Sequence, residues 1–525
     1  MIRPFRRTLL HFTKLAPLLA LAACQEPRRD ALGPLDGATN AAHAEQGQRT
    51  APPGSARIGD TLVPGSGNGG YDVTSYDLAF EFDAADRPMR ARATLAAVAS
   101  QALGSFNLDF HGLEIEALEV DGKPARFERN ADELTVFPAE PVDQGATFTT
   151  SVRYGGIPTG VKDPSAPVDD IGWLSSAGEI YVFSQPNGAM SFFPCNDHPL
   201  DKARFTISID VPQPLEAVAN GVLVETREHG ERRTFVWKAR DPMATYLVTL
   251  AIAEFDEQEL VGPNGLVIVN YFTKGSRASA RKPFERTGEF ITFLSETFGP
   301  YPFEICGNIL SNVSIGLALE TQTKPVYGRG AAGEATIVHE LAHQWFGNAV
   351  SVQDWNDIWI NEGISEYAAW MYLEKHKGRE AFEQELLRNY VMAREAKASA
   401  PGKPGVREMF GIGVYVRGPL ALHAVRVGLG DERFLALMRS WVAEHLHGNA
   451  SLEDFLEHVE RHGTPELRAT LESWLNDSTM PSVPAWDAEW KKQQEERDAR
   501  RKAREDERKK RDTQKSEAPA GSAGG

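Results

Sequence analysis

The chain has 525 residues, with 42% hydrophobic and 25% charged side chains, a composition typical of soluble globular proteins and a length sufficient for two or three domains. Its net charge of −17, with no basic patch interleaved with aromatic residues in the folded region, argues against a nucleic-acid-binding protein. Only three cysteines occur, which excludes a disulfide framework, and Cys195 and Cys306 form either one disulfide or two buried thiols.

Residues 1–23 have the pattern of a secretory signal peptide, in which a basic start precedes the apolar run L-A-P-L-L-A-L-A-A. This run is too short to span a bilayer as a mature helix. The residues L-A-A-C ending at Cys24 resemble the lipobox of bacterial lipoproteins, which implies that Cys24 is lipidated and anchors the chain in the cell envelope. Gln25 after the cysteine implies the outer membrane if the host has two membranes. An ordinary signal peptide cut after Ala23 stays open as the alternative.

Residues 24–70 are rich in Ala, Gly, Pro and polar side chains without apolar periodicity, which predicts a flexible tether. From residue 71 apolar side chains alternate, as in Y-D-L-A-F-E-F at 76–82 and F-T-I-S-I-D-V at 205–211. The turn pairs Asp121-Gly122 and Asn220-Gly221 separate such runs. The pattern predicts an antiparallel β-rich domain over 71–257.

After residue 257 the pattern becomes mixed. Apolar residues at helical spacing precede Gly299 and Pro300, which predicts a helix that ends there, and a strand is expected around Gly307 to Leu310. From Asp431 onward apolar residues three and four apart predict further helices.

His339, Glu340 and His343 form the pattern H-E-x-x-H. Positions four apart lie on one face of a helix, so both histidines can direct a ring nitrogen at one metal ion. Glu340 lies off that axis, within reach of a water on the metal. These residues predict a catalytic zinc site, which needs a third protein ligand and one open position.

Glu362 is the expected third ligand, since it follows His343 after eighteen intervening residues. Gly347 is expected to close the first helix, and a second helix is predicted from about Trp359 to His376. Glu366 lies one turn after Glu362, where it can accept an N–H from a ligand histidine. A surface salt bridge is the alternative for Glu366.

The segments H-E-L-A-H-Q-W-F-G-N and W-N-D-I-W-I-N-E-G-I-S-E-Y closely resemble the aminopeptidase N and leukotriene hydrolase family of zinc peptidases. The resemblance implies a multi-domain α+β protein. Its N-terminal β domain over 71–257 lends one wall to the active site of a thermolysin-like mixed α/β catalytic domain over 258–480. That second domain is mostly helical in its C-terminal part. One Zn²⁺ per chain and peptide substrates with a free N-terminus are implied as well, in a short form without the family's large C-terminal helical domain.

Three further residues gain a role from this resemblance. Glu320 stands in G-L-A-L-E-T-Q-T where the family has G-x-M-E-N, and the family's glutamate binds the α-ammonium of the substrate. Gln185, nine residues before Pro194 in P-C-N-D-H-P, corresponds to a residue that helps to hold the same amine. Tyr415 in G-V-Y-V-R-G supplies a phenolic hydroxyl to the developing oxyanion.

Each of these three residues has a plain structural alternative. Glu320 would then be an exposed strand residue, Gln185 a loop amide bonded to its own backbone, and Tyr415 a buried core side chain. The replacements Leu319 and Thr321 beside Glu320 bear on the shape of the subsite.

Pro481 and Pro484 are expected to end the folded part. Residues 481–525 are a charged, low-complexity tail, interpreted as a solitary solvated helix or an unstructured solubilising segment.

The resulting hypothesis is a membrane-tethered zinc aminopeptidase in which Glu340 serves as general base and then as general acid. An endopeptidase, an epoxide hydrolase at the same zinc, and a catalytically idle peptide-binding lipoprotein stay open.

Overall fold

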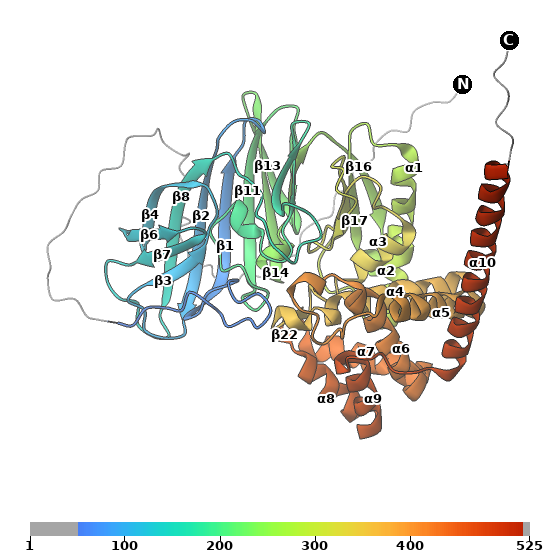
Figure 1. Cartoon of the computed structure of the whole chain (residues 1–525). Helices are drawn as coiled ribbons and strands as arrows, with labels where there is room; N and C mark the ends of the chain where they lie inside the picture. Colours follow the sequence, from blue (N-terminus) through green and yellow to red (C-terminus); the bar gives the residue numbers. More distant parts are fainter. Residues whose placement is uncertain (1–50, 518–525) are drawn as a thin grey trace, which may run out of the picture. The chain divides into compact units, whose positions relative to one another are not determined.

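The computed structural model describes residues 51–517 (Figure 1). The predicted signal peptide, Cys24, the first part of the predicted tether and residues 518–525 lie outside them. The strands are β1 (Tyr71–Glu81), β2 (Met89–Ala99), β3 (Phe106–Asp109), β4 (Glu114–Val120), β5 (Lys123–Pro124), β6 (Arg126–Asn130), β7 (Glu133–Phe137), β8 (Thr147–Gly156), β9 (Gly172–Ser176), β10 (Glu179–Phe183), β11 (Ala203–Pro212), β12 (Glu216–Ala219), β13 (Val222–His229), β14 (Arg232–Met243), β15 (Leu250–Ala253), β16 (Phe255–Val261), β17 (Val267–Thr273), β18 (Cys306–Leu310), β19 (Ala318–Leu319), β20 (Val326–Tyr327), β21 (Ser351–Val352) and β22 (Asn449–Ala450). The α-helices are α1 (Ala278–Arg281), α2 (Thr287–Phe298), α3 (Glu334–Ala342), α4 (Trp359–Lys377), α5 (Arg379–Ala396), α6 (Gly418–Leu429), α7 (Asp431–His445), α8 (Leu452–His462), α9 (Pro465–Asn476) and α10 (Pro484–Glu517).

Strands β1 to β15 form the β domain, which contains three sheets. The largest has the order β13-β14-β11-β1-β2-β8-β4-β5, and the others have the orders β12-β15-β10-β9 and β3-β7-β6. The expected antiparallel pairing holds with one exception in this domain, since β1 and β11 run parallel from Ser75↔Arg204 to Glu81↔Asp210. These two strands are far apart in the sequence, so no hairpin forces them to run in opposite directions.

The predicted alternation in the β domain is confirmed by burial. In β1 the side chains of Tyr76, Leu78 and Phe80 are buried, and Tyr76 pairs with Leu95 of β2. Asp121-Gly122 forms the expected hairpin turn between β4 and β5. Asn220-Gly221 instead links strands of two different sheets, and the Gly221 N–H donates to Thr323 Oγ1 of the following domain at 2.8 Å.

The prediction of a flexible tether is wrong for residues 51–70, because these residues bind partners far away in the sequence. The side chain of Asn68 donates to Asp109 in β3, and its backbone N–H donates to Asn196. Thr61 bonds twice to Asp354, nearly three hundred residues further along the chain. Residues 51–70 therefore form an ordered polar segment, because other elements supply hydrogen-bond partners for its side chains and backbone.

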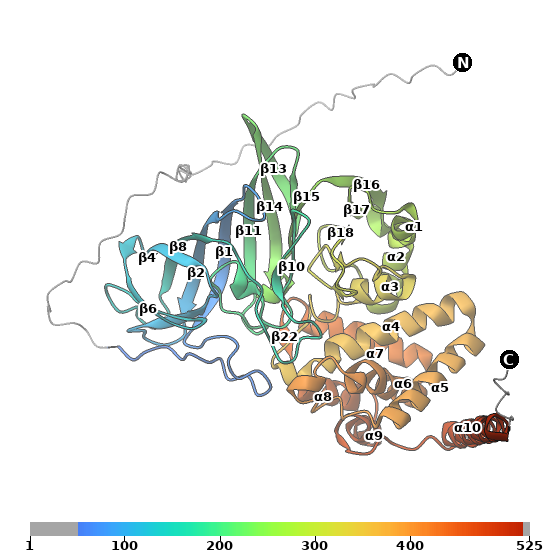
Figure 2. The ribbon, with the colours of Figure 1, turned by 45° about the horizontal axis from the view of Figure 1, so that its top comes forward.

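The α/β domain begins with β16 at Phe255, slightly earlier than the predicted boundary at residue 258. Its sheet has the order β16-β17-β18-β20-β19, with β17, β18 and β20 parallel. The predicted helix before Gly299 is confirmed as α2, and Gly299 ends it with a φ of 104°. The predicted strand is β18, and the predicted second zinc-site helix is α4. Helices α3 and α4 pack against each other (Figure 2).

The solitary-helix interpretation of the tail is wrong for its first turns. Helix α10 starts against α5, where the Tyr390 hydroxyl donates to Asp487 at 2.6 Å and Arg394 pairs with the same carboxylate at 3.1 Å. The rings of Trp486 and Tyr390 have centroids 5.2 Å apart. An aromatic anchor and a paired carboxylate thus attach the helix to the domain before its charged run begins.

Cys195 and Cys306 are both buried and free, which confirms the alternative of two buried thiols. None of the helices within residues 51–517 has both the length and the apolar composition that a membrane crossing requires.

Candidate active site

Helix α3 presents His339 and Glu340 from its last turn, and His343 is its C-cap residue. The expected closure of this helix at Gly347 is wrong, because the α-helix already ends at Ala342. Beyond it, the N–H groups of Asn348 and Ala349 donate to the carbonyls five residues earlier, at 3.0 and 3.1 Å. Bonds of this span widen the backbone and replace the α-helical ladder, and Gly347 follows with a φ of 114°.

Helix α4 carries Glu362 in its first turn and Glu366 one turn later. Its N-terminus follows a short 3₁₀ turn, η5 (Trp355–Asp357), and the Glu362 N–H donates to Ile358 O at 3.0 Å. The Glu362 side chain is 2% exposed. A carboxylate buried to this degree needs a cation or several hydrogen-bond donors.

His339, His343 and Glu362 bring three ligand atoms together in a nearly equilateral triangle. The two histidine Nε2 atoms are 3.0 Å apart, and Glu362 Oε2 lies 3.3 Å from His339 Nε2 and 3.2 Å from His343 Nε2. Tetrahedral zinc with bonds of about 2.0 Å requires ligand atoms about 3.3 Å apart. The triangle therefore has the size of one face of a zinc coordination sphere.

The partners of the opposite ring nitrogens show that both Nε2 atoms present lone pairs. His343 Nδ1 donates to the carbonyl oxygen of Phe346 at 3.0 Å, and His339 Nδ1 faces Glu366 Oε2 at 3.0 Å. Trp370 Nε1 donates to the other oxygen of Glu366 at 2.8 Å and so orients that carboxylate. The arrangement is the usual support for metal-binding imidazoles, and the residues fit Zn²⁺. Glu366 thus lies beside the ring of a ligand histidine, as predicted.

Glu340 is buried beside this triangle, with a carboxylate oxygen within 4.8 Å of ligand atoms of His343 and Glu320. Burial raises the pKa of Glu340 to about 7, against the opposing effect of His339 and His343. A nearby Zn²⁺ would lower this pKa. A carboxylate that titrates near neutrality is suited to accept and return a proton.

Tyr415 lies on a π-helical turn, Gly413–Arg417, and its ring is nearly parallel to the His339 ring at a centroid distance of 5.9 Å. Tyr415 lines the same cavity as His339 and Glu340, so the alternative of a side chain enclosed in the hydrophobic core is wrong. Burial and the charges of Glu362 and Glu320 raise the pKa of Tyr415 well above its ordinary value. The hydroxyl therefore keeps its proton and can donate it in a hydrogen bond.

Glu320 and Gln185 meet on the other wall of the site. Gln185 Nε2 donates to Glu320 Oε1 at 3.0 Å, across the junction of the two domains. Glu320 is 2% exposed, so the exposed-strand alternative is wrong. Burial, reinforced by Glu362 and opposed by His343, raises the pKa of Glu320. The pair is thus a buried carboxylate that accepts one amide N–H from the β domain.

Two residues that the sequence analysis did not single out hold this wall in place. Gln344 Nε2 and Asn348 Nδ2 donate to the backbone carbonyl of Glu320 at 3.1 and 2.7 Å. Both belong to the H-E-L-A-H-Q-W-F-G-N segment, so the signal was present in the sequence without an indication of their partner. The segment that carries the zinc ligands thereby also fixes the position of Glu320.

A cavity of about 580 Å³ lies beside the zinc triangle and reaches His339 and Glu340. Its polar lining includes Gln185, His339, Glu340, Glu366 and Tyr415. Its apolar lining comes from segments that are far apart in the sequence, so their meeting could not be predicted from a motif. These residues are Pro167, Val168, Ile171, Phe183, Leu317, Ala318, Leu319, Ala331, Ala335 and Phe410.

Glu444, His458 and His462 form another grouping of potential metal ligands in the described part of the chain. Here the guanidinium of Arg461 already lies 2.8 Å from His458 Nδ1 and 2.9 Å from Glu444 Oε2. A resident side-chain cation thus takes the place that a metal ion would need. At His339, His343 and Glu362 the ligand atoms face one another directly.

Comparison with known proteins agrees with this geometry. The Peptidase M1 N-terminal domain matches residues 73–247, and the Peptidase family M1 domain matches residues 317–474. The crystal structure of an M1 zinc metallopeptidase from Deinococcus radiodurans is 30% identical with a TM-score of 0.77, and the match covers 82% of this chain and 98% of that one. The chain belongs to peptidase family M1. This membership confirms the expected β domain, α/β domain and zinc.

Longer M1 relatives share only part of their length with this chain. Aminopeptidase M1 of Arabidopsis thaliana is 25% identical over 57% of this chain and 37% of its own length. Probable aminopeptidase 2 of Sulfurisphaera tokodaii is 22% identical over 72% of this chain and 50% of its own length. The chain thus spans half or less of these two curated relatives.

We expect Glu366→Ala to weaken zinc binding by roughly 10- to 100-fold, because His339 then loses the carboxylate that orients its ring. Competition with a chromogenic chelator measures the affinity. Glu383→Ala is the matched control, since this glutamate on α5 is 62% exposed and pairs only with Arg379 among the described ion pairs. Equal zinc affinity in both variants would remove Glu366 from the metal site.

Proposed function

We propose that this chain is a zinc-dependent aminopeptidase that removes N-terminal residues from peptides. The observation that carries the proposal is the hydrogen-bonded Glu320–Gln185 pair, whose buried carboxylate lies beside His343 of the zinc triangle. A carboxylate in this place pairs with a free α-ammonium, which sets the first peptide bond at the metal. The related Deinococcus radiodurans structure, that of a mutant protein with Tyr-Ser-Ala bound as substrate, supports a short peptide as the substrate.

His339, His343 and Glu362 would hold Zn²⁺, which would supply a water of lowered pKa and an electrophile for the scissile carbonyl. Glu340, buried beside the metal ligands, accepts the proton of the attacking water and then passes that proton to the leaving amine. Tyr415 donates its hydroxyl proton in a hydrogen bond to the carbonyl oxygen as negative charge develops there. Glu320 and Gln185 hold the amino terminus throughout.

Matched peptides test this proposal. We expect a peptide with a free N-terminus to be shortened one residue at a time and its N-acetylated counterpart to resist cleavage, because acetylation removes the cation that Glu320 binds. Chelation should abolish cleavage, and added zinc should restore it. Product analysis by mass spectrometry distinguishes sequential trimming from internal cuts. Chelator-sensitive internal cleavage of both peptides would establish an endopeptidase instead.

Glu320→Ala provides the complementary variant in that assay. It should lose most activity on the free peptide and most of the discrimination against the acetylated one, while zinc binding is retained. If Glu320→Ala still prefers the free amino terminus, the ammonium site lies elsewhere. Cleavage of neither peptide by the wild-type chain would favour an epoxide hydrolase or a peptide-binding protein.

We expect Tyr415→Phe to lower kcat by roughly two to three orders of magnitude with little change in KM, as for other donors to a developing oxyanion. Steady-state kinetics on the free peptide measure both constants. Glu340→Gln serves as the reference for a lost proton acceptor and should retain zinc with almost no turnover. A Tyr415→Phe enzyme with wild-type kcat would exclude this hydroxyl from the reaction.

The cell-envelope anchor is a further part of the proposal. Its support is the L-A-A-C sequence ending at Cys24 after an apolar run. Incorporation of a labelled fatty acid that Cys24→Ser abolishes would establish the anchor, and equal labelling of both chains would refute it.

A further inference from the structure

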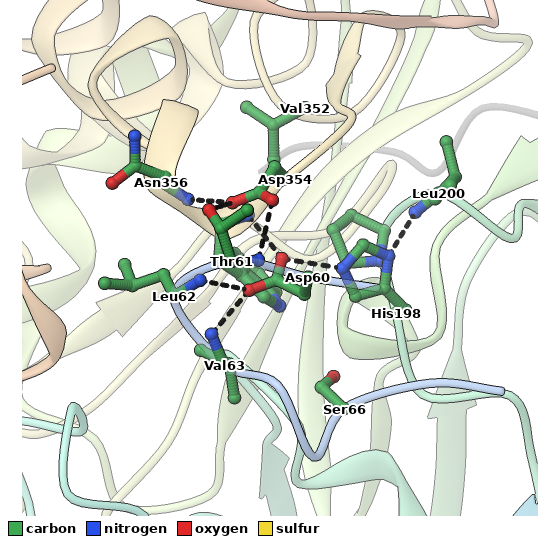
Figure 3. A network of polar contacts seen from close by, with 12 residues as sticks. Asp60, Thr61, Leu62, Val63, Ser66, His198, Leu200, Val352, Asp354 and Asn356 are labelled. Atoms are coloured by element: carbon green, nitrogen blue, oxygen red, sulfur yellow. Dashed lines mark hydrogen bonds and ion pairs between the residues drawn. The ribbon is translucent and has the colours of Figure 1, made fainter. Parts of the chain in front are cut away.

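Residues 51–70, here called the N-terminal strap, contact both domains through one buried carboxylate. The Asp60 side chain is fully buried and accepts four hydrogen bonds (Figure 3). Its Oδ1 accepts from the N–H groups of Leu62 and Val63 in the strap itself. Its Oδ2 accepts from Trp355 N at 2.7 Å and from His198 Nε2 at 2.9 Å.

Asp60 is thus a three-way junction. His198 belongs to the β domain and Trp355 to the α/β domain, so the carboxylate ties the strap to both. The Leu200 N–H donates to His198 Nδ1 at 3.1 Å, which leaves Nε2 as the protonated nitrogen that donates to Asp60. Burial would raise the pKa of Asp60, but the hydrogen bonds from His198, Trp355 and Val63 hold it below its ordinary value.

Thr61, the next residue of the strap, binds the α/β domain one residue before Trp355. Thr61 donates to both oxygens of Asp354, from its N–H at 2.8 Å and from its hydroxyl at 2.9 Å. Asp354 is the N-cap of η5 and accepts from Asn356 N at 2.8 Å (Figure 3). Through Asp60 and Thr61 the strap therefore fixes the two residues at which η5 begins.

Helix α4 follows η5 directly, so this fixation reaches the zinc ligand. The C-cap of η5 is Ile358, which is also the N-cap of α4, and Ile358 O accepts from Glu362 N at 3.0 Å. Only one short 3₁₀ turn and one helical turn thus separate Asp60's partner Trp355 from Glu362. A displacement of Trp355 would shift the start of α4 and the Glu362 carboxylate with it.

The Trp355 ring also contacts the β domain. It packs edge-on against the Tyr246 ring at a centroid distance of 5.2 Å. Burial and the charges of Glu320 and Glu362 raise the pKa of Tyr246 well above its ordinary value. Trp355 thus joins an aromatic ring of the β domain to the segment that leads into α4.

We propose that Asp60 is a positioning residue of the active site, which holds the start of α4 through Trp355 and Asp354 and so places Glu362 for the metal. This role rests on the zinc site of the proposed function, but not on the preference for a free amino terminus. The strap would then contribute to metal binding in addition to joining the β domain to the α/β domain.

Asp60→Asn in the full chain tests the proposal. The amide replaces one acceptor oxygen with a donor, so one pair of its N–H donors loses its partner while the size of the side chain is kept. We expect zinc to dissociate roughly ten times faster, at the lower end of the range for groups that orient metal ligands. The visible spectrum of the Co²⁺-substituted protein should change, and kcat should fall more than KM changes.

Asp210→Asn is the matched control, because Asp210 also pairs with a histidine but has its partners His229, Arg232 and Thr234 within the β domain. It should lower the thermal midpoint without changing zinc release or the Co²⁺ spectrum. If Asp60→Asn and Asp210→Asn both lower the midpoint and both keep wild-type zinc release and Co²⁺ spectra, the proposal is overturned.

Thr61→Val covers the case in which Asp60→Asn fails to fold. Thr61 is exposed, and the substitution removes only the hydroxyl bond to Asp354. It should speed zinc release in the same direction and to a smaller extent, and unchanged release would overturn the proposal. Zinc release is measured without a peptide, so a wild-type chain that binds zinc but cleaves nothing would refute the proposed function and leave this test valid.

Discussion

The Nε2 atoms of His339 and His343 lie 3.0 Å apart, and each lies within 3.3 Å of the same buried carboxylate oxygen of Glu362. When both imidazoles are neutral and donate through Nδ1, three acceptor atoms face one another, which is repulsive unless a proton or a metal ion lies between them. A bound metal ion would therefore also hold α3 and α4 together, as is usual where a metal and a fold are coupled. The rest of the site is arranged around this requirement.

A second consequence is a cluster of buried acids. Glu320, Glu340 and Glu362 are all buried and lie close enough to affect one another's pKa. Burial disfavours the ionised carboxylates and the neighbouring carboxylates add to this effect, so the pKa of Glu340 is raised to about 7 and that of Glu320 is raised as well. The charges and hydrogen bonds of His343 and His339 instead lower the pKa of Glu362, against the effect of burial. A bound ammonium would provide such a partner at Glu320. The electrostatics of the pocket thus favour a positively charged end of a substrate at one defined place.

The residues that touch the metal could be predicted from the sequence because their geometry is local. The spacing of His339 and His343 sets one helical face, and Glu362 and Glu366 share a face of α4 for the same reason. The strap could not be predicted, since a Gly- and Pro-rich stretch without apolar periodicity has the composition of a tether. Its order depends on Asp60 meeting His198 and Trp355, residues that lie more than a hundred and nearly three hundred positions away. Likewise the attachment of α10 could not be predicted, because its sequence is mostly charged and the contact of Trp486 with Tyr390 exists only in the folded chain.

The contacts of Gln344 and Asn348 join the zinc triangle to Glu320 through a single segment. The segment that supplies His343 also donates to the backbone carbonyl of Glu320, so the zinc triangle and the Glu320 residue belong to one hydrogen-bonded unit. In the proposed aminopeptidase reaction, these side-chain bonds to the Glu320 backbone would hold in place the carboxylate that binds the amino terminus. The apolar lining around Phe183, Leu319 and Phe410 could then vary without altering where the peptide is cut. The proposed exopeptidase register and the side-chain preference would therefore depend on different parts of this site.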